Sequence, residues 1–222
     1  MKKTVIFDLD GTLADTSGDL IAAANTVFRT LGHDEPLDRL GDALTAFHGG
    51  RAMLRLGLSR LDAEADDAAI DRMFIDFVAA YTADIDVHTT FYPGVVEAVS
   101  ALEVGGYHQG ICTNKPGKQA EILMQRLGLR DRFASLVAAD TLPVRKPDPA
   151  PFIESVRRAG GDPARSVLIG DTETDVKTAR AAGVPVVLVA FGPEGEGISR
   201  LKPDAMLAHY DDLPDLVADL IG

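Results

Sequence analysis

Two aspartates separated by one residue form the first site that could carry chemistry. Asp8 and Asp10 follow the apolar run 5–7, and Gly11 comes next. Because successive residues of a strand face opposite ways, residues 8 and 10 point to the same side. Two carboxylates that close raise each other's pKa unless a cation or a proton intervenes. The pair therefore indicates either a cation site or an Asp-Gly turn with an acidic neighbour.

Three further polar sites follow along the chain. Thr113 and Asn114 come after a second apolar run, where a hydroxyl and an amide either donate hydrogen bonds to an anion or cap a helix or turn. Lys146 precedes a Pro-Asp-Pro segment that fixes the backbone, so its ammonium is either an inward point charge or a solvated group. Asp171 and Asp175 lie one helical turn apart, and they either share a working face or decorate a helix N-terminus.

Short apolar runs without alternation are the elements that would position these residues. They cover 5–7, 110–112, 136–138, 167–169 and 186–189, and they are typical of strands buried on both faces of a parallel sheet. Helical patterns separate them at 97–102, 119–127, 151–159 and 175–182, the last three stopped by glycine. The alternation predicts an α/β fold, a Rossmann-like three-layer sandwich around a central parallel sheet. Such sheets assemble their sites at the carboxyl ends of the strands.

One stretch interrupts the alternation. Residues 16–87 show helical periodicity alone, which predicts an inserted all-helical module, with 1–15 and 88–222 forming the α/β core. Two apolar faces mark its helices, and the pattern favours core packing for them: Leu20, Ala24, Val27, Phe28 and Leu31, then Ile70, Met73, Phe74, Phe77, Val78 and Tyr81.

Composition narrows the class of partner. The chain has 222 residues, 46% of them hydrophobic, and 22 basic against 34 acidic residues give a net charge of −12. This excludes intrinsic disorder and argues against binding to nucleic acid or to anionic membranes. It does not exclude a small anion in a locally positive pocket. A single cysteine and the lack of a signal peptide or spanning segment lead us to expect a cytoplasmic protein. We expect a monomer or a homodimer.

Hard oxygen ligands from Asp8, the Asp10 carbonyl and Asp171 suit Mg²⁺. Taken in order, the motifs Asp-x-Asp-Gly-Thr, Thr-Asn, Lys-Pro and Gly-Asp-x-x-x-Asp resemble those of the haloacid-dehalogenase-like hydrolase superfamily over the whole chain. Among its members, the sequence most resembles bacterial phosphoglycolate phosphatases. The local features that carry this are 113–115, 48–51 and 191–195.

The resemblance implies a role for each core residue. Asp8 would attack phosphorus and form an aspartyl-phosphate, and Asp10 would be the general acid and later the base. Thr113, Asn114 and Lys146 would hold the phosphoryl oxygens.

The same resemblance assigns the metal ligands. Asp171 would ligate Mg²⁺ together with Asp8 and Asp10, while Asp175 would support the ion or bind it through water. The implied reaction is Mg²⁺-dependent hydrolysis of 2-phosphoglycolate or a similar small phosphorylated metabolite. Pyrophosphatase and sugar-phosphate mutase remain alternatives.

The resemblance also implies that the helical insert 16–87 is the superfamily's cap domain and that 1–15 and 88–222 form the catalytic core. One branch of the superfamily is excluded, and the sequence argues strongly against a second. Its dehalogenases lack an acid two residues after the nucleophile, where this chain has Asp10. Phosphonoacetaldehyde hydrolases use a cap lysine, and residues 16–87 contain none. A phospho-accepting signalling module also combines aspartates, a hydroxyl and a lysine around Mg²⁺, but it is shorter and has no helical insert.

Substrate choice would depend on the cap and on one core lysine. A turn at Gly50 would present Arg51 to a substrate carboxylate, because a guanidinium matches that group in a bidentate pair. His48 would assist, and Lys115 is a second candidate for the same carboxylate. The alternative for Arg51 is a solvated side chain on a plain loop.

Overall fold

A computed structural model describes residues 2–63, 65–192 and 194–222. Segment 191–195 is one of the three that carry the resemblance to phosphoglycolate phosphatases, and its residue Pro193 lies outside the described residues. The chain divides into two units, one made of Met1–Ala14 and Phe91–Gly222 and the other of Asp15–Thr90.

A six-stranded parallel sheet organises the first unit. Its strands are β1 (Lys2–Phe7), β4 (His108–Cys112), β5 (Ser135–Val137), β6 (Gly161–Gly170), β7 (Val186–Val189) and β8 (Ala205–Leu207), in the order β5-β4-β1-β6-β7-β8. The predicted α/β fold with a central parallel sheet is confirmed. The apolar runs identified five of the strands, while β8 was missed because it has three residues and is only partly buried.

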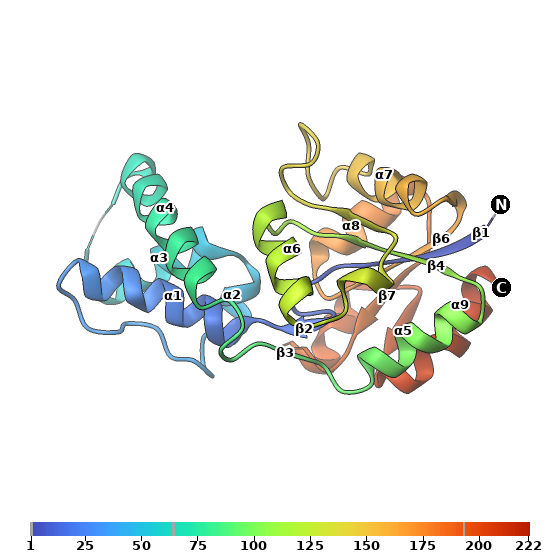
Figure 1. Cartoon of the computed structure of the whole chain (residues 1–222). Helices are drawn as coiled ribbons and strands as arrows, with labels where there is room; N and C mark the ends of the chain where they lie inside the picture. The colour runs from blue at the N-terminus through green and yellow to red at the C-terminus, as the bar shows by residue number, and fades with distance from the viewer. Residues whose placement is uncertain (1, 64, 193) are drawn as a thin grey trace. The chain divides into compact units, whose positions relative to one another are not determined.

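Helices cover both faces of this sheet (Figure 1): α7 (Ala150–Arg158) and α8 (Glu173–Ala182) lie on one, α5 (Val95–Val104) and α9 (Leu213–Ile221) on the other. The remaining helices are α6 (Gly117–Arg126) and three 3₁₀ turns, η1 (Arg130–Arg132), η2 (Gly195–Leu201) and η3 (Tyr210–Asp212). Phe152 and Val156 of α7 pack with Ile6, Leu168 and Leu188 of the sheet in one apolar cluster. This rigid core is the platform that carries the polar strand ends.

The second unit is helical. It contains α1 (Ser17–Thr30), α2 (Ala43–Phe47), α3 (Gly50–Arg60) and α4 (Asp67–Ala83). Two short strands, β2 (Ala14–Asp15) and β3 (Thr90–Phe91), pair with each other at the ends of this segment. Helices are thus the only regular elements described between β2 and β3, as the periodicity predicts.

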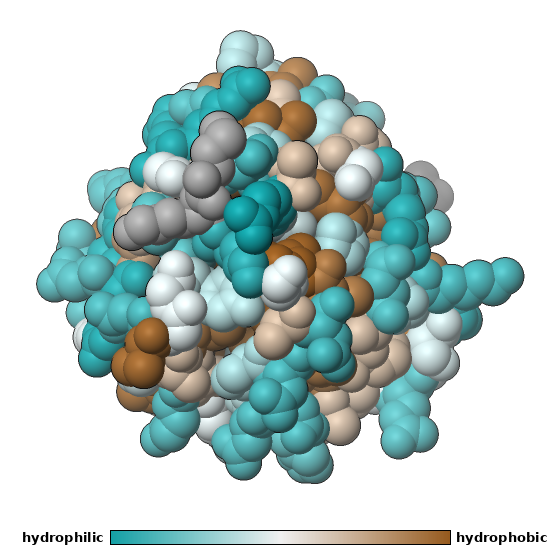
Figure 2. Space-filling view, turned by 90° about the vertical axis from the view of Figure 1, so that its right-hand side faces the viewer, coloured by the Kyte–Doolittle hydropathy of each residue, from teal (hydrophilic) through white to brown (hydrophobic). Residues whose placement is uncertain are grey.

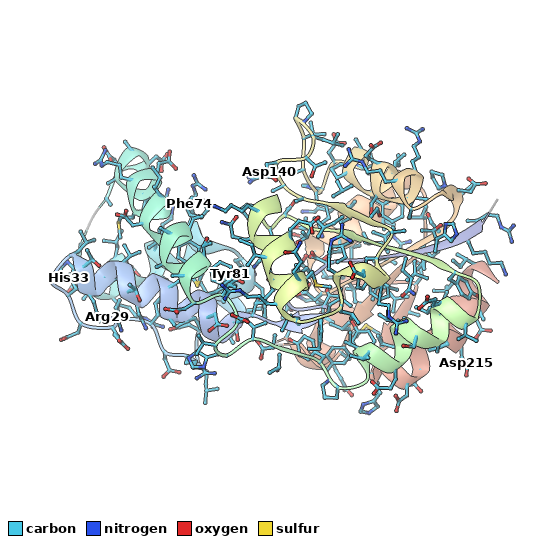
Figure 3. All side chains as sticks on the ribbon, in the orientation of Figure 1. Arg29, His33, Phe74, Tyr81, Asp140 and Asp215 are labelled. Carbon is cyan, nitrogen blue, oxygen red and sulfur yellow. The ribbon has the colours of Figure 1, made fainter. Side chains whose placement is uncertain are left out.

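The apolar faces predicted for the helical unit are largely buried. Phe74, Phe77 and Tyr81 form a stack along α4, with ring centroids 5.7 and 6.3 Å apart (Figure 3 labels the outer two). Leu31 is the exception, because it follows the last residue of α1 and is 53% exposed.

One face of the molecule is largely hydrophilic. On the face shown in Figure 2, hydrophilic side chains predominate and apolar ones lie among them in small groups. The described helices include none long and apolar enough to cross a membrane.

Candidate active site

Three strands of the sheet end at the same edge with polar residues. Asp8 follows β1, Thr113 follows β4 and Asp171 follows β6, and all three strands run parallel. The Asp8 amide donates to the carbonyl of Ile169 at 2.9 Å, and the Thr113 amide donates to that of Val137 at the same distance. The sheet ladder therefore continues into the polar residues and fixes where their side chains begin.

Lys146 joins two carboxylates inside this edge. Its Nζ lies 2.9 Å from Oδ2 of Asp8 and 2.7 Å from Oδ1 of Asp175, and its side chain is 1% exposed. Burial alone would lower the pKa of Lys146, but the carboxylates of Asp175 and Asp8 outweigh it and raise that pKa above its ordinary value. Lys146 is thus an inward-pointing cation, as one of the two sequence interpretations required.

Asp175 has both carboxylate oxygens engaged by the protein. Oδ1 binds Lys146, while Oδ2 accepts from the Thr172 hydroxyl at 2.7 Å and from the amides of Thr172 and Asp171 at 3.1 and 3.3 Å. The bond from the Thr172 amide is one half of the capping box of α8, in which Thr172 is the N-cap residue. A Cβ on Gly170 would overlap the Asp175 side chain, so glycine is required there. Asp175 therefore organises the site and caps the helix at once.

The carboxylates of Asp8, Asp171 and Asp175 form a buried acidic cluster. One oxygen from each lies within 4.8 Å of the others. Burial, with the negative charge of Asp175, raises the pKa of Asp8 to about 6 against the pull of Lys146. Burial and the charges of Asp175 and Asp8 raise the pKa of Asp171 well above its usual range.

These charges define what the cluster can bind. With all three carboxylates ionised, their charges and that of the Lys146 ammonium would sum to −2 in a buried space, and the raised pKa values of Asp8 and Asp171 reflect burial together with this crowding of negative charge. A divalent cation with a preference for hard oxygen ligands would balance that charge. The donor set therefore fits the predicted Mg²⁺. Asp8 and Asp171 accept fewer hydrogen bonds from the protein than Asp175 does, so they are the carboxylates with more capacity left to bind the ion.

Asp10 takes part in a different contact. Its carboxylate binds Nζ of Lys115, at 2.8 Å to Oδ1 and 3.2 Å to Oδ2. Lys115, predicted as a ligand for a substrate carboxylate, is thus paired with the predicted general acid. The Asp10 carbonyl as a metal ligand, and Lys115 as a substrate ligand, stay predictions.

Thr113 and Asn114 connect the strand end to the loops beside it. The Thr113 hydroxyl accepts from the Lys115 amide at 3.2 Å, and Nδ2 of Asn114 donates to the Lys146 carbonyl at 3.0 Å. Asp140, labelled in Figure 3, accepts from the Gly117 amide at 2.8 Å and holds the start of α6. The backbone that carries Lys146 is therefore tied to the end of β4.

Cys112, the last residue of β4, is chemically inert. Its side chain is buried, and burial raises the pKa of its thiol to about 12.

The predicted cap residues belong to the helical unit. Arg51 donates through Nε and Nη2 to Oδ1 of Asp71, at 3.0 and 2.7 Å, and its guanidinium lies 4.0 Å from the Phe74 ring centroid. Gly50 is needed for packing, since a Cβ there would meet the rings of Phe77 and Phe74. His48 ends α2. Their roles in substrate binding stay predictions.

Two supporting residues were not assigned from the sequence. The Thr12 hydroxyl donates to Oδ1 of Asp171 at 3.0 Å, and the buried Tyr210 hydroxyl donates to the Thr12 carbonyl at 2.8 Å. Thr12 could have been found, because it belongs to the Asp-x-Asp-Gly-Thr motif. Tyr210 lies far along the chain in a segment without a motif, so only the structure reveals it.

Comparisons with known proteins agree on one family. The model for haloacid dehalogenase-like hydrolases matches residues 5–189. Phosphoglycolate phosphatase of Mesorhizobium japonicum is 39% identical over 211 residues, 94% of this chain and 92% of the relative. That of Rhodospirillum rubrum is 39% identical over 229 residues, 100% of this chain and 92% of the relative.

A solved structure shows the same fold. The crystal structure of a predicted phosphoglycolate phosphatase from Haemophilus somnus superposes with a TM-score of 0.82 at 24% identity, covering 97% of each chain. Its identity is low enough that it supports the architecture alone. With the family model and the relatives above, the chain belongs to the haloacid dehalogenase-like hydrolases and is a phosphatase of that family.

Proposed function

We propose that this protein is a Mg²⁺-dependent phosphomonoesterase that works through an aspartyl-phosphate. The observation that carries the proposal is the buried cluster of Asp8, Asp171 and Asp175, whose ligand atoms lie within 4.8 Å of one another beside Lys146. A cluster left with two negative charges repels a phosphate dianion. Bound Mg²⁺ would supply the charge neutralisation that lets the carboxylate and the phosphate approach each other.

The residues divide the reaction between them. Asp8 attacks phosphorus as Asp10 donates a proton to the leaving oxygen, and the P–O bond of the ester breaks. Asp10 then takes a proton from the attacking water, the P–O bond to Asp8 breaks, and inorganic phosphate leaves. The hydroxyl of Thr113, the amide of Asn114 and the ammonium of Lys146 bind the phosphoryl oxygens.

We further propose 2-phosphoglycolate, or a similarly small carboxylated phosphate ester, as the substrate. Relatives at 39% identity that cover nearly the whole chain are named phosphoglycolate phosphatases. Arg51, His48, Gly50 and Lys115 remain the candidates for binding the substrate carboxylate. The acidic composition with one cysteine supports a cytoplasmic location, and neither nucleic acid nor membrane is part of the proposal.

A phosphate-release panel tests the reaction and its substrate. With Mg²⁺, we expect the highest kcat/KM for 2-phosphoglycolate, compared with pyrophosphate, glucose 1-phosphate and nucleoside monophosphates. EDTA should abolish release, and excess Mg²⁺ should restore it. Preference for pyrophosphate, or conversion of glucose 1-phosphate to its 6-phosphate, would favour the alternative members of the superfamily. Full activity in EDTA would contradict the metal requirement.

The raised pKa of Asp8 predicts how Mg²⁺ binding depends on pH. The pKa of Asp8 is about 6 in the fold and 3.8 as a free side chain. Between these two pH values the metal-free fold therefore keeps a proton on Asp8 that the unfolded chain loses. Stability from this group is therefore present at low pH and is lost as pH rises through about 6. Mg²⁺ relieves this destabilisation, so it should raise the Tm markedly at pH 7.5.

At pH 5 the Tm shift on adding Mg²⁺ should be smaller, because the ion must displace the proton from Asp8. Differential scanning fluorimetry at both pH values measures the effect. Asp171→Asn should remove the shift, whereas Asp131→Asn, an exposed carboxylate, should keep it. Equal shifts at pH 5 and pH 7.5 would contradict the assignment of the cluster as the metal site.

A further inference from the structure

The ion pair between Lys115 and Asp10 has a consequence for catalysis beyond substrate recognition. The side chain of Lys115 is 3% exposed, while that of Asp10 is 21% exposed. The buried partner is thus the cation, and the more exposed partner is the group that must meet the leaving oxygen and the water. Both carboxylate oxygens of Asp10 lie within 3.2 Å of the ammonium.

The backbone around Lys115 is fixed on both sides. Its amide donates to the Thr113 hydroxyl at 3.2 Å, and its carbonyl accepts from the Ala139 amide at 3.1 Å. Lys115 therefore extends from the end of β4, with its stem buried and its ammonium placed by the sheet.

Asp10 has less local support of its own. It lies in the turn after β1, where Gly11 adopts a positive φ of 77° and its amide donates to the Ala14 carbonyl at 2.9 Å. These bonds shape the backbone of the turn and do not involve the carboxylate. The contacts to Lys115 fix its direction.

We propose that Lys115 is a positioning residue that holds the Asp10 carboxylate in the orientation needed for both proton transfers. This inference rests on the proposed function, because it assumes that Asp10 is the acid and base of phosphate ester hydrolysis. It differs from binding of a substrate carboxylate in one respect: it acts on every substrate, including those without a carboxylate. A misdirected general acid or base forfeits much of the ~10²–10⁴-fold that such catalysis contributes.

The test uses p-nitrophenyl phosphate, which has no carboxylate, beside 2-phosphoglycolate. For Lys115→Met we expect kcat to fall about 10²-fold on both substrates, with KM for p-nitrophenyl phosphate within about two-fold of the original. Lys115→Arg, which keeps a cation that can bind both oxygens, should recover part of the loss. Lys118→Met, an exposed lysine in the next helix, is the matched control and should leave kcat unchanged.

A double-mutant cycle separates positioning from a merely structural role. If Lys115 acts through Asp10, adding Lys115→Met to Asp10→Asn should cost almost nothing further in kcat. The double variant also removes both charges of the pair, so it guards against failure of the single variant to fold. The Mg²⁺-induced rise in Tm should persist in both, because the acidic cluster is intact.

Each contrary outcome has one meaning. A wild-type kcat for p-nitrophenyl phosphate in Lys115→Met would overturn the proposal, even if KM for 2-phosphoglycolate rose. An equal loss from Lys115→Met with and without Asp10→Asn would overturn it as well. Failure of the proposed function can be told apart from failure of the positioning role of Lys115, because the unmodified protein would then release phosphate from neither substrate.

Discussion

Asp8→Asn should lower kcat for phosphate release by at least about 10⁴-fold, since an amide cannot act as the nucleophile that begins the reaction. The fold should remain intact. Asp8 is a buried carboxylate whose pKa burial raises to about 6, so neutralising it removes a charge that the metal-free fold tolerates poorly at neutral pH. We therefore expect the Tm of the variant in EDTA at pH 7.5 to equal or exceed that of the unmodified protein.

Acid-quench labelling makes the same variant a test of the covalent step. With ³²P-labelled substrate, the unmodified protein should carry a label that is stable to acid and released by hydroxylamine, as expected of an acyl phosphate. Asp8→Asn should carry none. Labelling of the variant, or turnover above the stated limit, would remove Asp8 from the nucleophilic role. Asp131→Asn, at an exposed position, controls for general effects of losing a carboxylate.

Lys146→Met should be the most destabilising of the site substitutions. The ammonium is 1% exposed and lies within 2.9 Å of two carboxylates, so its removal leaves Asp8 and Asp175 as buried carboxylates without a compensating cation. Losing one member of a buried ion pair costs about 3–5 kcal/mol. We expect a decrease of this size in the free energy of unfolding, measured by urea denaturation in EDTA at pH 7.5. Activity should fall about 10²–10³-fold, as when a group that stabilises the transition state is removed.

A surface lysine provides the comparison. Lys177 pairs with Glu173 one turn away on α8, and both side chains are about 60% exposed (59% and 61%). Lys177→Met should therefore change the free energy of unfolding by less than about 0.5 kcal/mol. If both lysine variants were equally stable, Lys146 would not be the cation that compensates the acidic cluster.

The sequence was sufficient for those parts of the site that follow from strand ends. Asp8, Thr113 and Asp171 each come directly after an apolar run, and parallel strands bring their carboxyl ends to one edge of a sheet. That argument needs no knowledge of side-chain direction. It also explains why the cluster around Lys146 could be anticipated as a group before its distances were known.

Side-chain pairings could not be predicted in the same way. Asp10 and Lys115 lie 105 positions apart in the sequence. Each lies in a loop that follows a strand, and their contact depends on the rotamers that the two side chains adopt there. The same is true of Tyr210, which supports Thr12 from near the carboxyl end of the chain. Periodicity gives the face of an element, but it does not say which of several carboxylates a lysine will contact.

Short elements and the exact ends of helices could not be predicted from the sequence either. Strand β8 has three residues, and Leu31 fits the apolar face of α1 although the helix has ended before it. Arg51 shows a related limit. Its type suits a carboxylate, and the carboxylate that it contacts in the structure is Asp71, a residue of the protein itself.

Asp175 serves both the stability of the fold and the chemistry of the site. One of its oxygens closes the first turn of α8, and the other binds the lysine of the site. A substitution at this position therefore affects the helix cap and the ammonium contact together. Only a side chain of nearly the same length and charge could keep one contact while changing the other. Gly170 narrows the choice again, since its missing Cβ makes room for this side chain. Natural drift would thus be expected to spare residues 170 and 175 together.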